Sequence, residues 1–412
     1  MRKSVKPSAV SGKLRAPASK SVAQRAIAVA AITKGQSVVH YHGSSDDVVS
    51  AIRVCRTLGA DIEQQPDKLI INGGISQPLQ KLDCGEAGLG IRMFSPIAAT
   101  LSRPVTLTGR GTLTQRPMNI IEQSVKAMGA DCKTNNGYLP VTVTGPIMGG
   151  TANVDGSISS QVLTGMLIAT PKAKSDLTIE VHNLQSKPYI NLTIEVMKAF
   201  GVEVENDNYH RFSVMPGSEY KPAELIVEGD WSGAAFLLAA GAIAGKVRVD
   251  NILLSSKQAD RAIMDALDMA GASILTGDNF VEISKSELKC FNFDATDCPD
   301  LFPPLVALAT YCEGITRIKG ISRLIGKESD RAATLQKEFA KLNVDIKTEG
   351  EEMIIKGGRP DGGLVESHGD HRIAMACAVA GLRAKGVVEI DGAEAVAKSY
   401  PEFFDDIEKI MG

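Results

Sequence analysis

The chain has 412 residues, of which 44% are hydrophobic and 23% are charged, a composition typical of a folded globular protein. That length is too great for one ordinary core and predicts two or three domains or an array of repeats. The formal net charge of −3 argues against broad adhesion to nucleic acid or membranes, so any anion site must be local. No secretory signal or membrane-spanning stretch is expected, and the seven scattered cysteines favour free thiols in a reducing cytoplasm.

The first strong element is a helix start at Lys20. Ser19 and Ser21 are candidate N-caps, and no helix-breaking residue follows until Gly35. A helix that begins here presents unpaired backbone N–H groups beside Lys20, Ser21 and Arg25, which together form a candidate anion site. The alternative is a capped surface helix whose two cations are simply solvated.

Helix starts of this kind recur along the chain at a nearly constant interval. Each is followed by an apolar run and then by a strand rich in β-branched residues. The six starts are 68, 71, 71, 70 and 70 residues apart and lie at Lys20, Gly88, Ser159, Asp230, Asp300 and Asp370. The strands that follow them are predicted over 38–41, 105–108, 177–181, 247–250, 316–318 and 387–390. A register held over the whole chain predicts six repeats of about 70 residues.

A second series of amphipathic helices is predicted to end at glycine, with a strand beyond each. These glycines are 70, 72 and 70 residues apart and lie at Gly59, Gly129, Gly201 and Gly271; Leu342-Asn343-Val344-Asp345 holds the next place, 71 residues on. The sixth repeat stops at Gly412 before its final strands, whereas residues 3–10 resemble a strand without a repeat of its own. We therefore expect the N-terminal segment to cross over and complete the sixth repeat.

The repeats predict an α/β protein with two lobes, because three repeats can cover each other's apolar faces whereas one cannot. The expected N-terminal lobe spans residues 13–227, and the expected C-terminal lobe combines 1–12 with 228–412. If the lobes present their helix starts to one another, several positive helix ends converge on one cleft that suits anionic ligands.

Further charged and polar residues stand at or near other helix starts. Lys327 and Arg331 are four residues apart and are predicted to share a helix face with Glu328 adjacent, although a solvated ion pair is the alternative. The remaining motifs are Gly85 to Arg92, Arg116-Pro117, Ser159-Ser160-Gln161, Ser186-Lys187-Pro188-Tyr189, Asp370-His371-Arg372 and Lys398.

The sequence lacks the common nucleotide, hydrolase and metal motifs. Glycines 85, 88 and 90 do not form Gly-x-Gly-x-x-Gly, and neither a P-loop nor a Gly-x-Ser-x-Gly turn occurs. The histidine pairs 40/42 and 368/371 have no companion ligands at a recognisable spacing. We therefore predict no metal and no cofactor.

Taken together and in order over residues 3–404, these motifs resemble the 5-enolpyruvylshikimate-3-phosphate synthase (3-phosphoshikimate 1-carboxyvinyltransferase) family of enolpyruvyl transferases. The resemblance implies a two-lobed inside-out α/β barrel with three repeats per lobe. It also implies a cytoplasmic, monomeric transferase that moves the enolpyruvyl group of phosphoenolpyruvate to the 5-hydroxyl of shikimate 3-phosphate and releases phosphate. That step leads to chorismate and the aromatic amino acids, and the implied ligands are these two small molecules, with no nucleic acid or membrane.

The resemblance further implies roles for individual residues. Shikimate 3-phosphate is expected to contact Lys20, Ser21, Arg25, Ser159, Ser160, Gln161, Ser186, Asp300 and Lys327. Phosphoenolpyruvate is expected to contact Lys20, Gly88, Arg116, Gln161, Arg331, Arg372 and Lys398. The implied catalytic residues are Asp300 as acceptor of the hydroxyl proton, Glu328 as the group that exchanges a proton with the methylene carbon, Lys20 and His371. Such chemistry needs an acid, a base and cations around the leaving phosphate, but no metal.

Three positions depart from the usual pattern of that family. Glu86 and Arg323 stand where asparagine is common, and Leu89 stands where threonine is common. A carboxylate at Glu86 lowers affinity for phosphate unless it is paired, and Arg92 is the candidate partner. Because Gly88 is retained, the resemblance implies that the protein is a target of glyphosate.

Two alternative functions remain at this stage. A UDP-N-acetylglucosamine enolpyruvyl transferase would share the fold but is expected to carry a reactive cysteine near residues 110–120, and segment 109–116 contains none. A non-catalytic anion-binding repeat protein would have no clear use for Asp300 and Glu328, and the net charge disfavours a clamp on DNA.

Overall fold

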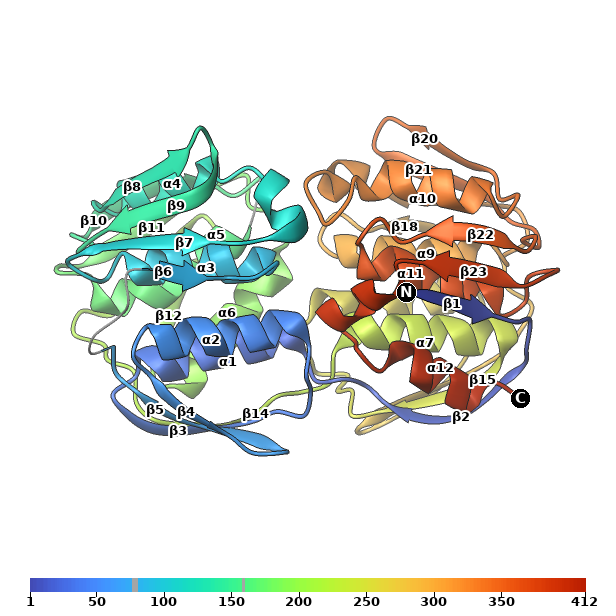
Figure 1. Ribbon diagram of the computed structural model, residues 1–412, viewed down its shortest axis with the longest axis horizontal. Helices are drawn as coiled ribbons and strands as arrows, with labels where there is room; N and C mark the ends of the chain where they lie inside the picture. Colours follow the sequence, from blue (N-terminus) through green and yellow to red (C-terminus); the bar gives the residue numbers. More distant parts are fainter. Residues whose placement is uncertain (76–80, 158–159) are drawn as a thin grey trace. The chain divides into compact units, whose positions relative to one another are not determined.

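The computed structural model describes residues 1–75, 81–157 and 160–412, which divide into two compact units (Figure 1). The N-terminal unit comprises residues 18–227, and the C-terminal unit combines 1–17 with 228–412. The first boundary thus follows residue 17 rather than residue 12. The reason is that strand β2 (Val10–Arg15) pairs along its whole length, in parallel, with β15 (Gly245–Asp250) of the C-terminal unit.

The elements of the N-terminal unit form three repeats, each with one sheet and two main helices. In chain order they are α1 (Lys20–Ile32), β3 (Gly35–His40), α2 (Asp46–Thr57), β4 (Asp61–Gln64), β5 (Lys68–Gly73), β6 (Lys81–Asp83), α3 (Gly88–Ala98), β7 (Pro104–Thr108), η1 (Gly111–Gln115), α4 (Asn119–Ala127), β8 (Asp131–Asn135), β9 (Tyr138–Thr144), β10 (Gly150–Asp155), α5 (Ser160–Ala169), η2 (Thr170–Lys172), β11 (Leu177–His182), α6 (Lys187–Ala199), β12 (Val204–Asp207), β13 (Arg211–Val214) and β14 (Glu224–Ile226).

The C-terminal unit repeats the same plan three more times. Besides β2 and β15 it contains β1 (Arg2–Val5), α7 (Trp231–Ala244), η3 (Ala259–Ala262), α8 (Ile263–Met269), β16 (Ser273–Gly277), β17 (Phe280–Ser284), β18 (Asn292–Asp294), η4 (Pro299–Leu301), α9 (Phe302–Ala309), β19 (Ile315–Lys319), η5 (Ile321–Leu324), α10 (Arg331–Ala340), β20 (Ile346–Glu349), β21 (Glu352–Lys356), β22 (Gly363–Glu366), α11 (His371–Gly381), β23 (Val388–Asp391), η6 (Ala393–Lys398) and α12 (Phe403–Ile410).

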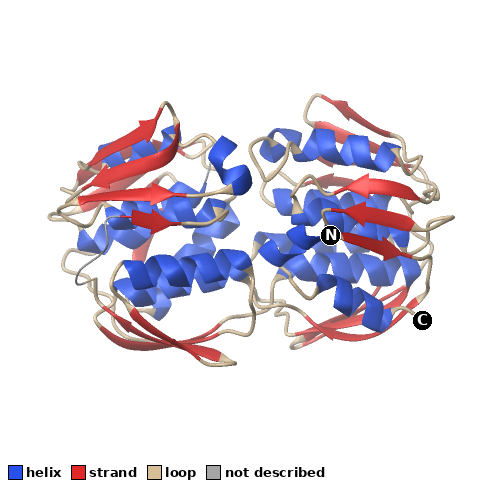
Figure 2. Ribbon diagram, viewed as in Figure 1, coloured by secondary structure: helices blue, strands red, loops and turns tan. Residues whose placement is uncertain are grey.

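The sheets share one strand pattern, so the predicted six repeats are confirmed. In the described residues the sheet orders are β14-β3-β5-β4, β6-β7-β9-β8, β10-β11-β13-β12, β2-β15-β17-β16, β18-β19-β21-β20 and β1-β23-β22. In the four-stranded sheets, the strand after the first helix has a parallel neighbour on one side and an antiparallel hairpin on the other. Within each unit the sheets lie on the outer surface and the first helices of the repeats lie inside, whereas second helices such as α10 and α12 reach the surface (Figures 1 and 2).

The sixth repeat is completed by the N-terminus, as expected, but residues 3–10 do not form a single strand. Strand β1 pairs antiparallel with β23, whereas β2 belongs to the sheet of the fourth repeat. In the N-terminal unit, β14 likewise returns from the end of the third repeat to pair with β3 of the first. Each unit is therefore closed by a strand that comes from a distant part of the chain.

The predicted helix ends are also confirmed. Gly59, Gly129, Gly201 and Gly271 have φ of +105°, +82°, +82° and +75°, and Asn343 has +59°. These values lie in the left-handed region, which glycine adopts without strain and asparagine tolerates. The repeat period therefore follows from a backbone requirement that recurs at each of these turns.

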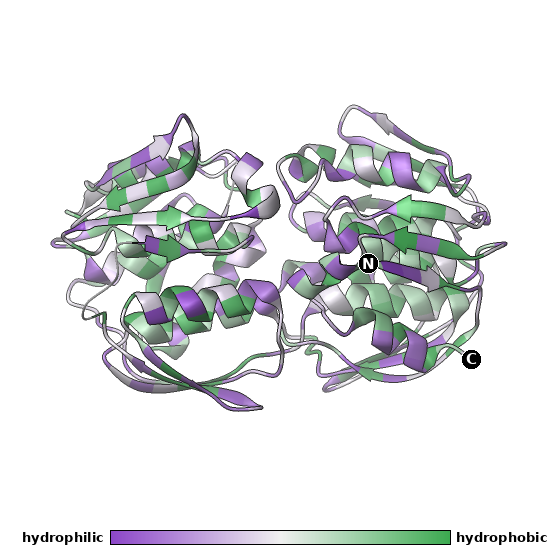
Figure 3. Ribbon diagram, viewed as in Figure 1, coloured by the Kyte–Doolittle hydropathy of each residue, from purple (hydrophilic) through white to green (hydrophobic). Residues whose placement is uncertain are grey.

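The first helices of the repeats form the cores of the two units. Every residue of α3, α7, α9 and α11 is buried. The ribbon of α7 is coloured white to green along most of its length in Figure 3, as expected for a helix that is apolar all round. On α7 and α11 the charged and hydroxyl side chains lie in the first turn, whereas α3 also buries Arg92 and Ser95 along its length. Across the described residues, no helix combines the length and apolar character needed to cross a membrane.

Closure by β1 generates a prediction about stability. Val5 is buried on β1, whereas its neighbour Ser4 is exposed. We expect Val5→Asn to lower the free energy of unfolding of the C-terminal unit by about 2–4 kcal/mol, because apolar burial is lost and an amide is desolvated. Ser4→Asn is the matched control and should be nearly neutral. Chemical denaturation measures both, and equal stability of the two variants would contradict closure by β1.

Candidate functional site

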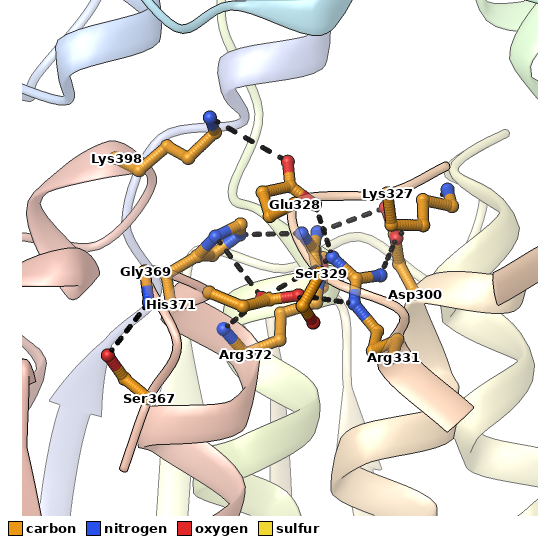
Figure 4. Close-up of polar contacts among 12 residues, drawn as sticks. Asp300, Lys327, Glu328, Ser329, Arg331, Ser367, Gly369, His371, Arg372 and Lys398 are labelled. Carbon is orange, nitrogen blue, oxygen red and sulfur yellow. Dashed lines mark hydrogen bonds and ion pairs between the residues drawn. The ribbon is translucent and has the colours of Figure 1, made fainter. Parts of the chain in front are cut away.

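The predicted site residues of the C-terminal unit gather around the guanidinium of Arg331, which is fully buried (Figure 4). Its Nη1 donates to Asp300 Oδ1 at 2.9 Å, and its Nη2 donates to Glu328 Oε2 at 2.6 Å. Its Nε donates to Asp370 Oδ2 at 2.8 Å. One buried cation is thus shared by three carboxylates, two of which are the predicted catalytic ones.

Lys327 and Glu328 lie in the loop that precedes α10 rather than on the helix. The helix begins at Arg331 because the Asp330 side chain accepts a hydrogen bond from the backbone N–H of Ala333. The prediction that Lys327 and Arg331 share a helix face was therefore wrong. Lys327 still reaches the same cluster, since its Nζ lies 3.4 Å from Asp300 Oδ1.

Asp370 connects the Arg331 cluster to the start of α11. Its Oδ1 accepts from the backbone N–H of Arg372 at 3.0 Å and so caps the helix. The Arg372 guanidinium then lies 3.1 Å from Asp300 Oδ2 and donates to Ser232 Oγ at 2.6 Å. Its Nη1 also donates to His371 Nε2 at 2.6 Å. Because arginine has no acceptor, His371 Nε2 must accept, which places the ring proton on Nδ1.

Lys398 approaches Glu328 from a different element. It is the last residue of η6, and its Nζ lies 3.8 Å from Glu328 Oε1 (Figure 4). Glu328 therefore lies between the cations of Arg331 and Lys398. The fold brings together every residue of the C-terminal unit for which the sequence predicted a role.

The charges in this cluster shift one another's pKa values. Burial alone would raise the pKa of Asp300, but the charges of Arg372, Lys327 and Arg331 outweigh it and hold that pKa well below its usual range. Burial lowers the pKa of Lys327 despite the opposing charge of Asp300. The carboxylates raise the pKa of Arg331 and Arg372 above the ordinary value against the effect of burial. Asp300 is thus held in its ionised form.

In the N-terminal unit, the start of α1 carries two cations with different partners. Lys20 Nζ lies 2.7 Å from Asp47 Oδ2 in the first turn of α2. Arg25 is 1% exposed, and its donors meet the hydroxyls of Thr193 and Thr164 together with carbonyl oxygens. No carboxylate pairs with Arg25 among the described residues. Burial lowers the pKa of Arg25 to about 10.

The start of α3 places two guanidinium groups around Gly88. A Cβ at Gly88 would collide with Arg116 Nη1 and would lie 3.2 Å from Arg92 Nη1, so only glycine leaves this space open. Arg92 Nη1 donates to Gln161 Oε1 at 3.2 Å. The carboxylate of Glu86 lies against Gly111, where a Cβ would overlap with it. These contacts bring Gly88, Arg116 and Gln161 together within one unit.

The remaining predicted residues of this unit stand at two helix starts. Ser160 is the buried first residue of α5, and Ser186 is the buried N-cap of α6 with φ of +57°. Ser21 accepts from Arg25 Nη1 through its backbone carbonyl at 2.8 Å. Ser159 lies outside the described residues. In the part of the chain that the structure covers, no group of three or more His, Cys, Asp or Glu side chains is arranged to hold a metal ion.

Four contact residues were missed from the sequence. Ser232 could have been identified from the sequence, because the repeat register aligns the second residue of α7 with the predicted Ser21 of α1. For Asp47, the sequence showed only an acidic residue in the first turn of a helix, which is a common feature and does not indicate a site. Thr164 and Thr193 lie inside helices among apolar neighbours, where a threonine is indistinguishable from a core residue in the sequence.

Comparisons with known proteins place the chain in one family. A family model described as EPSP synthase (3-phosphoshikimate 1-carboxyvinyltransferase) matches residues 5–407. The 3-phosphoshikimate 1-carboxyvinyltransferase of Clostridium novyi is 37% identical, over 98% of this chain and 96% of that protein. The protein of the same name from Thermococcus kodakarensis is 38% identical, over 98% of each chain.

Solved structures agree with the fold. An EPSP synthase from Acinetobacter baumannii superposes with a TM-score of 0.83 at 27% identity, over 100% of this chain and 98% of that one. The enolpyruvyl transferase NikO from Streptomyces tendae gives a TM-score of 0.81 at 16% identity, over 99% and 96% of the two chains. The second comparison is evidence for the two-lobed inside-out fold alone.

The lowered pKa of Asp300 predicts how stability changes with pH. Its folded pKa is depressed, so the stabilisation from its ionised form is present above the unfolded pKa of ~3.9 and is lost as the pH falls toward the folded value. We expect the difference in unfolding free energy between the wild type and Asp300→Asn to stay constant from pH 8 to about 4.5 and to shrink below it. Denaturant titrations at a series of pH values measure this. A change that begins near pH 6 would mean that the pKa is raised instead.

Proposed function

The chain belongs to the EPSP synthase (3-phosphoshikimate 1-carboxyvinyltransferase) family, and from that premise we propose how its residues carry out the reaction. The enzyme transfers the enolpyruvyl group of phosphoenolpyruvate to the 5-hydroxyl of shikimate 3-phosphate and releases phosphate, a step of the shikimate pathway. The observation that carries the proposed roles is the pair of carboxylates, Asp300 and Glu328, held by one buried guanidinium.

Asp300 is the base that accepts the proton of the 5-hydroxyl. Its contacts with Arg331, Arg372 and Lys327 keep it ionised, so a proton acceptor is ready before the substrate arrives. As the hydroxyl oxygen bonds to C2 of phosphoenolpyruvate, the C2–C3 double bond opens and C3 takes a proton. The product of this addition is a tetrahedral adduct that still carries the phosphate.

Glu328 is the acid that supplies the proton to C3. In the structure it lies between Arg331 and Lys398, which favour its carboxylate form. These two cations are also the proposed ligands of phosphoenolpyruvate, together with Arg372, Arg116 and the backbone of Gly88. Once the anionic groups of the substrate occupy them, these cations no longer pair with the carboxylate, and Glu328 takes up a proton from solvent before the addition.

Elimination then reverses the proton transfer at carbon. Glu328 takes a proton back from the methyl group, the C2–C3 double bond forms again, and the C2–O bond to phosphate breaks. Arginine and lysine side chains around the leaving phosphate stabilise its charge. His371 accepts a hydrogen bond from Arg372 and so orients that guanidinium during the elimination.

The N-terminal unit supplies the proposed contacts to shikimate 3-phosphate. Arg25 meets the carboxylate, because it is a buried cation whose described contacts include no acidic partner. Ser160 and Ser186 bind the phosphate from the starts of α5 and α6, where backbone N–H groups add positive potential. The other proposed contacts are Lys20, Ser21, Gln161 and Ser159, with Asp300 and Lys327 from the C-terminal unit.

Several further properties belong to this proposal. We propose that the protein acts as a monomer, since exposed apolar side chains such as Ile226, Leu275 and Ile315 lie on the sheets of three different repeats. We also propose a cytoplasmic location, which the seven free cysteines support. The open space at Gly88 supports inhibition by glyphosate.

The deciding assay for the substrate is release of phosphate from phosphoenolpyruvate. Release should require shikimate 3-phosphate and should not occur with UDP-N-acetylglucosamine. The segment of η1, Gly111–Gln115, contains no cysteine, which agrees with the family assignment and not with the sugar-nucleotide alternative. Release driven by the UDP-sugar would overturn the proposed substrate.

The proposed roles also predict how two substitutions divide their effects. Asp300→Asn should lower kcat by about 10²–10⁴-fold while binding of both substrates is largely kept, because a base is lost. Arg116→Ala should mainly raise the KM for phosphoenolpyruvate, whereas Arg110→Ala, an exposed arginine of the same segment, should leave it unchanged. Steady-state kinetics and equilibrium binding measure both effects. Equal loss of binding in Asp300→Asn and Arg116→Ala would contradict these assignments.

A further inference from the structure

Two buried threonines surround the guanidinium of Arg25 in the N-terminal unit. Thr193 Oγ1, on α6, receives a hydrogen bond from Arg25 Nε at 2.9 Å. Thr164 Oγ1, on α5, receives one from Arg25 Nη2 at 3.3 Å. Both threonines are 0% exposed, and their hydroxyl oxygens lie 2.9 Å apart. The side chain of Arg25 is therefore held from two neighbouring helices.

One set of proton positions satisfies every contact in this network. A hydroxyl has one proton to donate and two lone pairs that accept. Thr193 Oγ1 donates its proton to the carbonyl oxygen of Tyr189 at 2.9 Å, so both of its lone pairs accept. One accepts from Arg25 Nε, and the other must accept the proton of Thr164. Thr164, having donated, is left to accept from Arg25 Nη2. Both oxygens thus turn their lone pairs toward the cation.

Counting the N–H groups of Arg25 shows which of them remain for a ligand. A guanidinium has five N–H groups. That of Nε donates to Thr193, and one of the two on Nη1 donates to the Ser21 carbonyl at 2.8 Å. The two on Nη2 make longer contacts, with Thr164 and with the Tyr189 carbonyl. The second N–H of Nη1 has no acceptor among the described residues. The two longer bonds, at 3.3 and 3.4 Å, are weaker and more readily shared. A carboxylate can therefore be met by adjacent N–H groups of Nη1 and Nη2.

Burial makes this arrangement necessary. A cation removed from water needs acceptors, and the described contacts of Arg25 are hydroxyl and carbonyl oxygens only. Burial also lowers the pKa of Arg25 to about 10, which is consistent with a charge compensated only by dipoles. An incoming carboxylate supplies the missing opposite charge.

We propose that Thr164 and Thr193 are positioning residues for shikimate 3-phosphate, whose hydroxyls hold the Arg25 guanidinium so that its Nη1 and Nη2 edge meets the substrate carboxylate. This inference rests on the proposed role of Arg25. The threonines act through Arg25 and do not touch the substrate. Their contribution is orientation, since the fork of arginine recognises a carboxylate only when its plane is correctly set.

The test is Thr193→Val, which keeps the shape of the side chain and removes both acceptor sites of the hydroxyl. The KM and Kd for shikimate 3-phosphate should rise by on the order of tenfold, because a hydrogen bond to a charged group is lost. The KM for phosphoenolpyruvate and kcat should change little. Thr164→Val should raise the same constants by less, since its bond to Arg25 is longer. Thr193→Ser restores the hydroxyl and should return the constants close to wild type.

Two controls separate positioning from packing. Thr170 lies just beyond α5, and its buried hydroxyl donates to the Met166 carbonyl, its one described partner. Thr170→Val removes this hydroxyl and should leave binding unchanged. An analogue of shikimate 3-phosphate with a hydroxymethyl group in place of the carboxylate should bind equally to wild type and Thr193→Val, because the interaction that the threonine supports is then missing.

The outcomes distinguish this inference from the proposed function. If the wild type turns over shikimate 3-phosphate and Thr193→Val binds it as tightly as the wild type does, the positioning role is wrong. An equal loss of affinity for the hydroxymethyl analogue would also overturn it, since the effect would then be general packing. If the wild type itself does not use shikimate 3-phosphate, the proposed function fails first.

Discussion

The C-terminal unit depends on one buried guanidinium. Arg331 has no contact with solvent, so its charge must be balanced inside the protein. Asp300, Glu328 and Asp370 provide the balance, and without Arg331 those three carboxylates would repel one another. Asp370 accepts from Nε at 2.8 Å and, at the longer distance of 3.4 Å, from Nη2, whereas the shorter bonds of Nη1 and Nη2 go to Asp300 and Glu328. The cation thus orients the proposed base and the proposed acid at once.

The repeat plan explains how residues so far apart in the sequence meet. Helices α7, α9 and α11 are the first helices of the fourth, fifth and sixth repeats, and η4 leads directly into α9. Their starts supply Ser232, Arg372 and Asp300, which form one chain of contacts. The loop before α10 then adds Lys327 and Glu328, and η6 adds Lys398. The buried apolar bodies of the first helices fix where these polar starts lie, so packing of the core determines the geometry of the cluster.

Much of this could be predicted from the sequence because it depends on periodic features. The strands after each first helix and the positive φ at Gly59 or Asn343 follow from local backbone chemistry that repeats every 70 or so residues. The repeat period does not predict the structure of the N-terminal segment. Residues 3–10 were expected to form one strand, but β1 and β2 join the sheets of two different repeats. That choice depends on which sheet lacks a partner strand, a property of the assembled unit.

The sequence predicted the side-chain contacts less well than the backbone structure. The interval between Lys327 and Arg331 predicted a shared helix face, yet the cap at Asp330 starts the helix later and leaves Lys327 in a loop. Thr164 and Thr193 gave no signal, because a buried hydroxyl is distinguished from a methyl group only by the cation it meets in space. Interactions between repeats, in contrast to the period within them, require the three-dimensional arrangement.

The central claim is that Asp370 holds Arg331 in place for Asp300 and Glu328, the proposed catalytic carboxylates. It is tested most directly by the unfolding free energy of Asp370→Asn, compared with Asp361→Asn, whose carboxylate forms an exposed ion pair with Lys385. Loss of a buried partner should cost about 3–5 kcal/mol at Asp370, whereas loss of the exposed pair at Asp361 should change the stability far less. The account also predicts weaker binding of phosphoenolpyruvate by Asp370→Asn. An Asp370→Asn protein as stable as the Asp361→Asn protein would contradict the account.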